Sequence, residues 1–384
     1  MKTIALLGST GSIGESTLSL LRDHPDLAQV EILSAHTKIV KLIQQICEFK
    51  PKKAYLTGAK LTTVQIHAAK EFGCELIDNT DDLFTALESV SIDTVVLAMM
   101  GAAGLPYGLK ALDHGKSLAI ANKEPLVIAG HLFKAHQLEN NAEIIPIDSE
   151  HSAIFQCLFG EKVQDVERLI LTSSGGPFHN YKLEQFNSIK AEEALKHPTW
   201  VMGRKITVDS ASMMNKGLEM LEAKWLFDQP LHKIDVTVHR QSIVHSMVEY
   251  CDGSILAQLG ITDMKFPILY ALTYPERIDS NLPRLDFKTS MSWTFDTVNP
   301  FLSQAIDLIR EIGDDPVSCI VLNAANECYV EAFLNGKVPF SGIYSYLREV
   351  IEIGQGKVLA TENLSDISQL DQLARQWSLE KINS

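Results

Sequence analysis

Two carboxylates separated by one residue follow a short apolar run near the middle of the chain. Asp148 and Glu150 come directly after the run at 145–147. In an extended segment, residues i and i+2 point to the same side, so we expect both carboxylates on one face. Like charges repel unless a cation or proton lies between them. The pair suits Mg²⁺ or Mn²⁺ more than Zn²⁺, although two exposed acids at a strand end would look the same.

A second group of polar residues lies in a helix predicted over 209–219. Asn215 and Glu219 are four residues apart, and Lys216 and Glu219 are three apart, so the three side chains share one helix face. This face is a candidate ligand-binding surface. An ordinary ion pair between Lys216 and Glu219 explains the same spacing, and the residues alone leave both interpretations open.

The first predicted strand runs into GSTGSIG at 8–14. Glycines let the backbone turn tightly and approach a pyrophosphate, which then rests on the N-terminus of the next helix. On the first strand of a βαβ pattern, this spacing favours a dinucleotide over a ligand-free turn. The second strand ends in SAHTK at 34–38, without the acidic residue usual for NAD. This favours NADP(H), although His36 could also be an ordinary solvated residue.

Further loops carry small or polar residues where ligands could bind. MMGAAG at 99–104 and NKE at 122–124 follow predicted strands, and open α/β sheets bind ligands at the carboxyl ends of their strands. Lys123 is expected beside the nicotinamide. SSGGP at 173–177 could cradle a phosphate or form a simple turn. In the segment 197–205, Trp200 suits either a lid over a ligand or an anchor of the loop to the core.

The hydrophobic pattern places these residues in an α/β protein of several domains. Residues 1–150 predict a Rossmann-like NADP-binding domain with parallel strands at 3–7, 30–33, 54–56, 94–97, 117–120 and 143–147. Residues 151–275 predict an α+β catalytic domain with a lid at 197–210, a strand at 169–172 and a hairpin at 246–259. We expect a linker at 276–298 and a C-terminal α-helical bundle at 299–384, with helices beginning near 299, 316, 341 and 364.

The amino-acid composition excludes some kinds of binding partner and some cellular locations. The 384 residues include 34 Lys and Arg against 48 Asp and Glu, which gives a net charge of −14. This acidic balance argues against nucleic-acid binding, and no stretch approaches the roughly 18 apolar residues that span a membrane. The six cysteines lack CxxC spacing and the N-terminus lacks a signal-peptide pattern. We therefore expect free thiols, no zinc site and a cytoplasmic protein.

Taken together, the motifs resemble one family closely, the 1-deoxy-D-xylulose 5-phosphate reductoisomerases of the methylerythritol phosphate route to isoprenoids. The match runs in order over essentially the whole chain, and the block at 197–219 is highly specific. The matching motifs are GSTGSIG at 8–14, ANKE at 121–124, DSEHSA at 148–153, SSGGPF at 173–178, HPTWVMGRKITVDSASMMNKGLE at 197–219, QSIVHSMVEYCDGS at 241–254, LAQLG at 256–260 and DMKFP at 263–267.

The resemblance implies a homodimer that uses NADPH and a divalent metal (Mg²⁺, Mn²⁺ or Co²⁺) on a sugar phosphate. It implies metal ligands at Asp148, Glu150 and Glu219, which with Lys123 form the catalytic set. The implied substrate contacts are Ser149, Glu150, Ser174, His197, Trp200, Ser210, Asn215, Lys216 and Glu219, with Trp200 and Met202 in a lid. The implied cofactor contacts are Thr10, Gly11, Ser12, Ile13, Ala35, His36, Thr37, Asn122, Lys123, Glu124 and Gly203.

The implied reaction rearranges the carbon skeleton of 1-deoxy-D-xylulose 5-phosphate and reduces the resulting aldehyde to 2-C-methyl-D-erythritol 4-phosphate. A metal polarises the substrate carbonyl, and a lysine beside the oxygens stabilises developing negative charge. Two alternatives remain from the residues. One is an NADP-dependent oxidoreductase without the rearrangement, and the other is a non-catalytic NADP-binding sensor. The carboxylates argue against the first, because plain hydride transfer needs no metal site.

Overall fold

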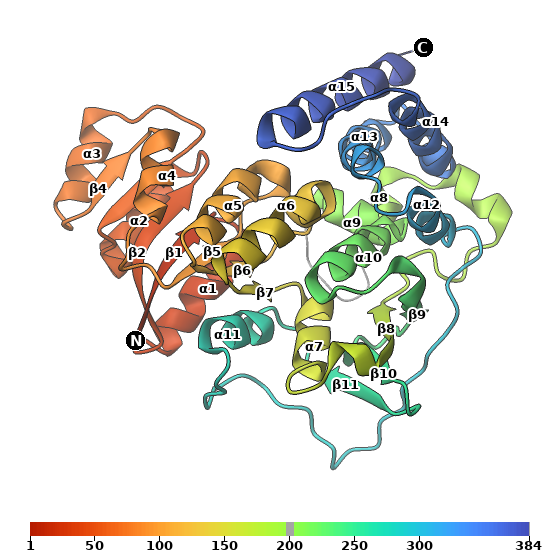
Figure 1. Cartoon of the computed structure of the whole chain (residues 1–384), viewed down its shortest axis with the longest axis horizontal. Helices are drawn as coiled ribbons and strands as arrows, with labels where there is room; N and C mark the ends of the chain where they lie inside the picture. Colours follow the sequence, from red (N-terminus) through yellow and green to blue (C-terminus); the bar gives the residue numbers. More distant parts are fainter. Residues whose placement is uncertain (197–202, 384) are drawn as a thin grey trace. The chain divides into compact units, whose positions relative to one another are not determined.

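The computed structural model describes residues 1–196 and 203–383, and the chain divides into two compact units. Unit 1 contains the N-terminal sheet and consists of Met1–Pro125, His131–Ser152 and Asp263–Leu282. Unit 2 contains a second sheet and the C-terminal helices and consists of Leu126–Gly130, Ala153–Thr262 and Pro283–Ser384. The predicted class is confirmed: a Rossmann-like parallel sheet is followed by an α+β region and a helical C-terminal region (Figure 1).

A parallel sheet forms the centre of unit 1. Within the described residues it has seven strands in the order β4-β3-β2-β1-β5-β6-β7. The order reverses at β1, which pairs with β2 on one side and β5 on the other, and this switch point is where such sheets bind ligands. The strands are β1 (Lys2–Leu7), β2 (Ala28–Ala35), β3 (Lys53–Leu56), β4 (Glu75–Ile77), β5 (Thr94–Leu97), β6 (Ser117–Ile120) and β7 (Ile144–Pro146).

Six of these strands match predicted ones, and β4 was missed. The predicted strands read as continuous apolar runs because both faces are covered; in β5, all four residues are buried. β4 has only three residues, of which Glu75 is exposed, so it carries no such run.

Helices cover the sheet of unit 1. Most alternate with the strands along the chain, but α11 comes from a distant segment within the predicted catalytic domain at 151–275. This apolar helix contacts α1 and β7, and the Lys2 ammonium donates to the Tyr274 carbonyl just after it at 2.9 Å. The helices are α1 (Ser12–Asp23), α2 (Ile39–Phe49), α3 (Thr63–Lys70), α4 (Thr80–Leu87), α5 (Leu105–Asp113), α6 (Glu124–Asn140) and α11 (Lys265–Thr273).

Unit 2 contains a mixed sheet of parallel and antiparallel strands. Its order is β11-β10-β8-β9, with strands β8 (Val166–Ser173), β9 (Ile234–Val238), β10 (Val244–Tyr250) and β11 (Ile255–Leu259). β10 and β11 form the predicted antiparallel hairpin around Asp252 and Gly253, which is confirmed. β9 was not predicted, because three of its five residues are only partly buried and they give no clear alternation.

Four further helices form the C-terminal part of unit 2 (Figure 1). They are α12 (Gln304–Ile312), α13 (Pro316–Leu334), α14 (Ile343–Gln355) and α15 (Leu364–Ile382), as the sequence predicted. The start of the first helix is later than predicted. Asn299 does not cap it; its amide instead donates to the carbonyls of His179 and Tyr181, each at 2.9 Å.

The long helix α13 is the apolar centre of this bundle. Contrary to the sequence expectation, its length and composition would suffice to cross a membrane, but 72% of the qualifying stretch is buried inside the protein. It contacts both α14 and α15. Packing inside the bundle therefore accounts for its apolar composition.

Candidate active site

The glycine-rich turn joins β1 to α1 at the switch point of the sheet. Gly8 has a φ of +88°, and a Cβ atom there would lie 2.4 Å from the carbonyl oxygen of Ala98, which follows β5. A Cβ atom at Gly14 would lie 2.5 Å from the carbonyl oxygen of Gly8. Both positions therefore require glycine, and the turn exposes backbone that a ligand can approach closely.

The N-terminus of α1 offers backbone N–H groups to such a ligand. Gly11 is the N-cap residue, so no side chain caps the helix. Of the predicted cofactor contacts, Thr10 is buried, Ser12 is exposed and Ile13 is partly buried. Uncapped N–H groups and the helix dipole attract anions, so the turn fits a pyrophosphate.

Neutral and basic residues follow β2. Ala35 is buried, whereas His36 and Thr37 are exposed. Beside them lies a shallow pocket lined by Thr37, Lys38, Ile39, Val40, Lys41 and Gln44. Two lysines and no acidic residue line it, which suits the additional phosphate of NADP(H). Lys41 and Gln44 were not among the predicted site residues; their position in the first turns of α2, directly after the predicted loop, was the available signal.

The carboxylate pair lies at the beginning of α7 (Ser149–Cys157). The extended conformation predicted here is wrong, because the Asp148 carbonyl accepts a helical hydrogen bond from the Ser152 N–H at 2.8 Å. The Asp148 carboxylate pairs with Lys123 Nζ at 2.5 Å, and Ser149 Oγ donates to Glu150 Oε2 at 2.6 Å. Only 5% of Lys123 is exposed, so the ion pair lies largely out of water, where each charge needs its partner.

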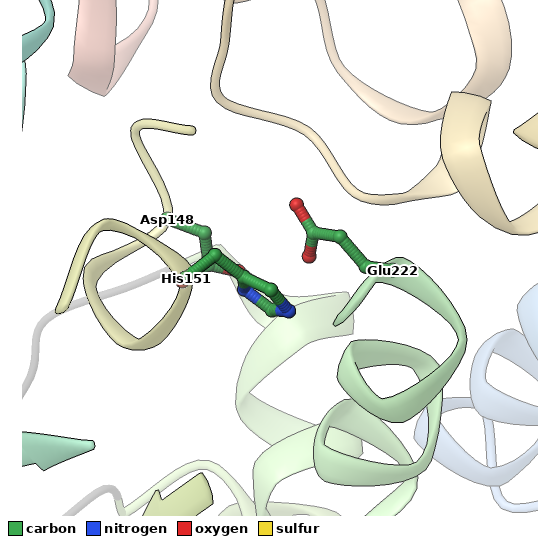
Figure 2. Close-up of side chains that lie close together, drawn as sticks. All are labelled: Asp148, His151 and Glu222. Atoms are coloured by element: carbon green, nitrogen blue, oxygen red, sulfur yellow. The ribbon is translucent and has the colours of Figure 1, made fainter. Parts of the chain in front are cut away.

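His151 is a neighbour of this pair that was not predicted as a site residue. It projects from the first turn of α7, as Figure 2 shows, and its side chain is completely buried. Its Nδ1 atom lies 3.9 Å from Asp148 Oδ2. Asn122 and Glu124 flank Lys123 at the start of α6 and are partly buried.

The second polar group lies on α10 (Met214–Phe227) in unit 2. The predicted helix at 209–219 is two helices, because Met213 adopts a left-handed conformation between α9 (Arg204–Ala211) and α10. Asn215 Nδ2 and Lys216 Nζ each donate to the Glu219 carboxylate at 2.5 Å, so the predicted shared face is confirmed. The ion pair between Lys216 and Glu219 is therefore present, and it is buried, because the two residues are 3% and 1% exposed. Glu222, drawn in Figure 2, lies one turn further along α10.

Small residues after β8 form the candidate phosphate cradle. Gly175 and Gly176 have positive φ, and the Gly176 N–H donates to Ser174 Oγ at 3.3 Å. A Cβ atom at Gly176 would lie 3.0 Å from the carbonyl oxygen of Ser210 on α9. The structure therefore brings together two predicted substrate-binding segments that are more than thirty residues apart.

A buried polar link that the sequence did not reveal holds α9 against α13. Asp209 is 1% exposed, and its carboxylate pairs with Lys205 Nζ at 2.9 Å. Asn326 Nδ2 on α13 donates to the same carboxylate at 2.9 Å. This link fixes the helix that carries Ser210.

The remaining predicted residues divide between the units or lie outside the described residues. Asp148 and Glu150 belong to unit 1, and Glu219 belongs to unit 2. Gly203 is the N-cap of α9, so the second half of the predicted lid at 197–210 is helical. His197, Trp200 and Met202 lie outside the described residues.

Fold and site together define a class. A glycine-rich turn at the switch point of a parallel sheet is typical of dinucleotide-dependent enzymes, and the second unit adds buried ionic side chains for chemistry. Comparisons with known proteins agree and are more specific. Family models described as 1-deoxy-D-xylulose 5-phosphate reductoisomerase, its C-terminal domain, and DXP reductoisomerase C-terminal domain match residues 4–130, 144–227 and 259–377. The chain belongs to the 1-deoxy-D-xylulose 5-phosphate reductoisomerase family, and the resemblance found in the sequence is confirmed.

Relatives and solved structures match over nearly their whole length. Reductoisomerases of Geobacter metallireducens and Bacillus subtilis are each 44% identical, covering 100% and 98% of this chain and 99% and 98% of their own. The Zymomonas mobilis enzyme in complex with NADPH is 38% identical with a TM-score of 0.90, covering 100% of this chain and 99% of its own. A reductoisomerase in complex with NADPH, fosmidomycin and magnesium is 36% identical with a TM-score of 0.89, covering 100% and 98%.

Proposed function

We propose that the chain converts 1-deoxy-D-xylulose 5-phosphate to 2-C-methyl-D-erythritol 4-phosphate, with NADPH as reductant and a divalent metal as cofactor. This is the reductoisomerase step of the methylerythritol phosphate pathway of isoprenoid biosynthesis. One observation carries the proposal: each unit has a buried lysine on a carboxylate, Lys123 on Asp148 and Lys216 on Glu219, both at 2.5 Å. Plain hydride transfer needs no metal held by Asp148, Glu150 and Glu219, whereas rearrangement of a hydroxyketone develops negative charge on oxygens that a metal and cationic lysines stabilise together.

Unit 1 binds NADPH in this proposal. The pyrophosphate lies on the turn around Gly11 and the uncapped N-terminus of α1. The exposed His36 and Thr37 and the lysines of the adjacent pocket contact the 2′-phosphate. Ala35, Asn122 and Glu124 complete the predicted cofactor contacts in unit 1. The relatives solved with NADPH support this assignment.

Asp148, Glu150 and Glu219 would hold the metal. Their carboxylate oxygens are hard donors of the kind that Mg²⁺ and Mn²⁺ prefer. Each carboxylate also accepts a hydrogen bond or ion pair from a neighbour on its own unit, which orients it as outer-shell partners orient ligands. When bound, the metal polarises the substrate carbonyl and lowers the pKa of the neighbouring hydroxyl. The magnesium in one related structure supports this cofactor.

Lys123 and Lys216 stabilise negative charge on the substrate oxygens. Both lysines are nearly inaccessible to water, at 5% and 3% exposure, and charge stabilisation is strongest in such an environment. Ser149 and Asn215 lie next to these groups and hold the substrate hydroxyls. Two lysines on different units thus act on one small substrate.

The phosphate of the substrate binds in unit 2. Ser174 and Ser210 stand on two segments that pack closely at Gly176, where a Cβ atom would lie 3.0 Å from the Ser210 carbonyl oxygen. The family resemblance implies a further phosphate contact at His197 and a lid that contains Trp200 and Met202, three residues that lie outside the described ranges. Closure over the phosphate protects the aldehyde intermediate from loss to solvent.

Oxidation of NADPH in the presence of 1-deoxy-D-xylulose 5-phosphate tests this function. The metal-stripped protein is assayed by NADPH absorbance with and without added Mg²⁺ or Mn²⁺, and the product is identified by mass spectrometry and NMR. We expect oxidation that requires both substrate and metal and yields 2-C-methyl-D-erythritol 4-phosphate. Oxidation that proceeds equally well without metal indicates an oxidoreductase without the rearrangement. NADPH binding without any oxidation indicates the sensor.

A homodimer in the cytoplasm completes the proposal. The family resemblance supports the dimer, and sedimentation equilibrium of the purified chain measures it directly. All six cysteines, each within the described ranges, are free thiols, which agrees with a reducing compartment. A monomer at micromolar concentration would contradict the dimer, but the catalytic proposal does not depend on this result.

A further inference from the structure

A buried amide on α2 contacts both sides of the glycine-rich turn, although it lies outside the motif. Ser9 Oγ, near the start of the turn, donates to Gln45 Oε1 at 2.6 Å. Gln45 Nε2 donates back to the Ser9 carbonyl at 3.0 Å, and its second N–H reaches Glu15 Oε1 in the first turn of α1. One side chain, only 3% exposed, therefore ties together the two segments between which a pyrophosphate would lie.

The chemistry of these contacts requires an amide. A glutamine offers two N–H donors and one carbonyl acceptor, and all three are used here. The same shape with a carboxylate would place negative charge against both the Ser9 carbonyl and the Glu15 carboxylate. The existing charge of Glu15 is balanced by Lys41, whose Nζ lies 3.3 Å from Glu15 Oε2. Lys41 and Gln45 are one helical turn apart, so α2 presents both groups to the turn on one face.

Ser9 has a further restraint that shows how closely the turn is held. Its side chain is fully buried, its Oγ lies 3.1 Å from the Ser34 carbonyl, and its N–H donates to the same carbonyl at 2.8 Å. Loss of the Gln45 amide would leave the Ser9 carbonyl without this donor in a buried place, which is costly. The turn would then populate conformations in which its N–H groups no longer converge.

We propose that Gln45 is a positioning residue that holds the glycine-rich turn in the conformation that receives the dinucleotide pyrophosphate. The role rests on the proposed use of NADPH. Gln45 affects cofactor binding, which precedes the chemical step. Only molecules in which the turn is formed bind the cofactor, so the apparent Kd equals the intrinsic Kd divided by the fraction of such molecules. Gln45 touches the turn and not the reacting atoms, so its loss affects cofactor affinity and leaves the chemical step intact.

Substitution of Gln45 by methionine tests the proposal, because methionine has similar size and no hydrogen-bonding N–H. We measure the Kd of NADPH by fluorescence titration, without substrate or metal, for the wild type, Gln45→Met and Gln45→Glu. We expect Kd to rise about tenfold for Gln45→Met and further for Gln45→Glu. The turnover number at saturating NADPH should stay within about twofold of wild type for Gln45→Met. The matched control is Gln137→Met on α6, a partly buried glutamine distant in sequence, with unchanged Kd expected.

Hydrogen exchange separates positioning from a general loss of stability. In Gln45→Met without NADPH, faster exchange should be confined to the amides of the turn and the first turn of α1. Ser9→Ala removes one of the three hydrogen bonds of Gln45 and should raise the Kd of NADPH by about threefold. This variant replaces Gln45→Met in the test if Gln45→Met does not fold. An unchanged Kd in a folded Gln45→Met, or in Ser9→Ala if the former is unfolded, would overturn the role. Wild-type protein that does not bind NADPH would overturn the proposed function as well.

Discussion

The glycine-rich turn of unit 1 and the cluster of Asn215, Lys216 and Glu219 on α10 of unit 2 differ in the groups that they offer to a ligand. The turn consists of backbone and small side chains, and at Gly8 and Gly14 an added carbon would collide with main-chain atoms. The cluster consists of polar side chains on one helix, with the buried ionic pair Lys216 and Glu219 and the partly buried Asn215, which also donates to Glu219. A site made of backbone is sensitive to volume, whereas a site made of buried charges is sensitive to charge. Substitutions that change only one of these properties should therefore affect only one site.

The largest effect is expected from a change of charge in the cluster. Glu219→Gln keeps the size of the side chain and removes its charge, so we expect turnover to fall by about 10³-fold or more. NADPH affinity should stay within about twofold of wild type, because Glu219 is not among the implied cofactor contacts and nearly all of these lie in unit 1. The control is Glu167→Gln, an exposed residue of β8, with unchanged turnover. Loss of NADPH binding in Glu219→Gln would show that the two regions are not separable.

A change of volume in the turn should give the converse result. Gly14→Ala forces a Cβ atom to within 2.5 Å of the Gly8 carbonyl, so we expect the Kd of NADPH to rise by about ten- to a hundredfold. Gly356→Ala is the control, because the φ of Gly356 is −72° and an added Cβ atom would lie 3.4 Å from the Glu352 carbonyl oxygen. Isothermal titration calorimetry measures both variants. Wild-type affinity in Gly14→Ala would contradict the close packing of the turn.

Two asparagines on α13 sharpen the comparison within unit 2, because both are completely buried and only one is hydrogen-bonded. Asn326 donates to Asp209, whereas neither amide atom of Asn323 has a partner among the described residues. Asn326→Leu should lower the free energy of unfolding by about 2 kcal/mol, because it removes a donor from a buried carboxylate. Asn323→Leu should be neutral or stabilising. Urea unfolding measures both; equal losses would mean that the contact with Asp209 contributes nothing.

The smallest effect concerns pH and His179. Burial, with the nearby charge of Arg240, lowers the pKa of the imidazole, and Asp296 opposes this in part. The unfolded chain therefore takes up a proton near pH 6.5 that the folded chain resists, so unfolding becomes easier as pH falls through this range. His179→Gln should reduce the difference in unfolding free energy between pH 7.5 and pH 5.5. An unchanged or larger difference in the variant would show that His179 does not titrate in this way.

Elements with continuous or periodic apolar residues were predictable from the sequence. Strands such as β1 and β5 are buried on both faces, and glycines at 8–14 mark a turn that only glycine can form. The break between α9 and α10 was not predictable, because Met213 adopts a left-handed conformation that glycine usually supplies. The position of α11 also could not be predicted, since an apolar helix does not specify which surface it covers.

In the candidate site, contacts between residues close in sequence could be predicted from their spacing, whereas contacts between residues distant in sequence could not. The face shared by Asn215, Lys216 and Glu219 follows from helical geometry, and the sequence predicted it. The ion pair between Lys123 and Asp148 spans 25 residues and depends on the pairing of β6 with β7, whose ends bring the two residues together. Gln45 lies 36 residues from Ser9, and no motif marks it. Its role depends on the packing of α2 beside the turn.

We propose that carboxylates from both units bind one divalent cation. Crystals of the protein with NADPH, soaked in Mn²⁺, test it through the anomalous scattering of manganese. We predict a single strong peak, with oxygens of Asp148, Glu150 and Glu219 at about 2.0–2.3 Å from it. A peak that is bound by Asp148 and Glu150 but not by Glu219, or no peak beside these residues, would contradict the account.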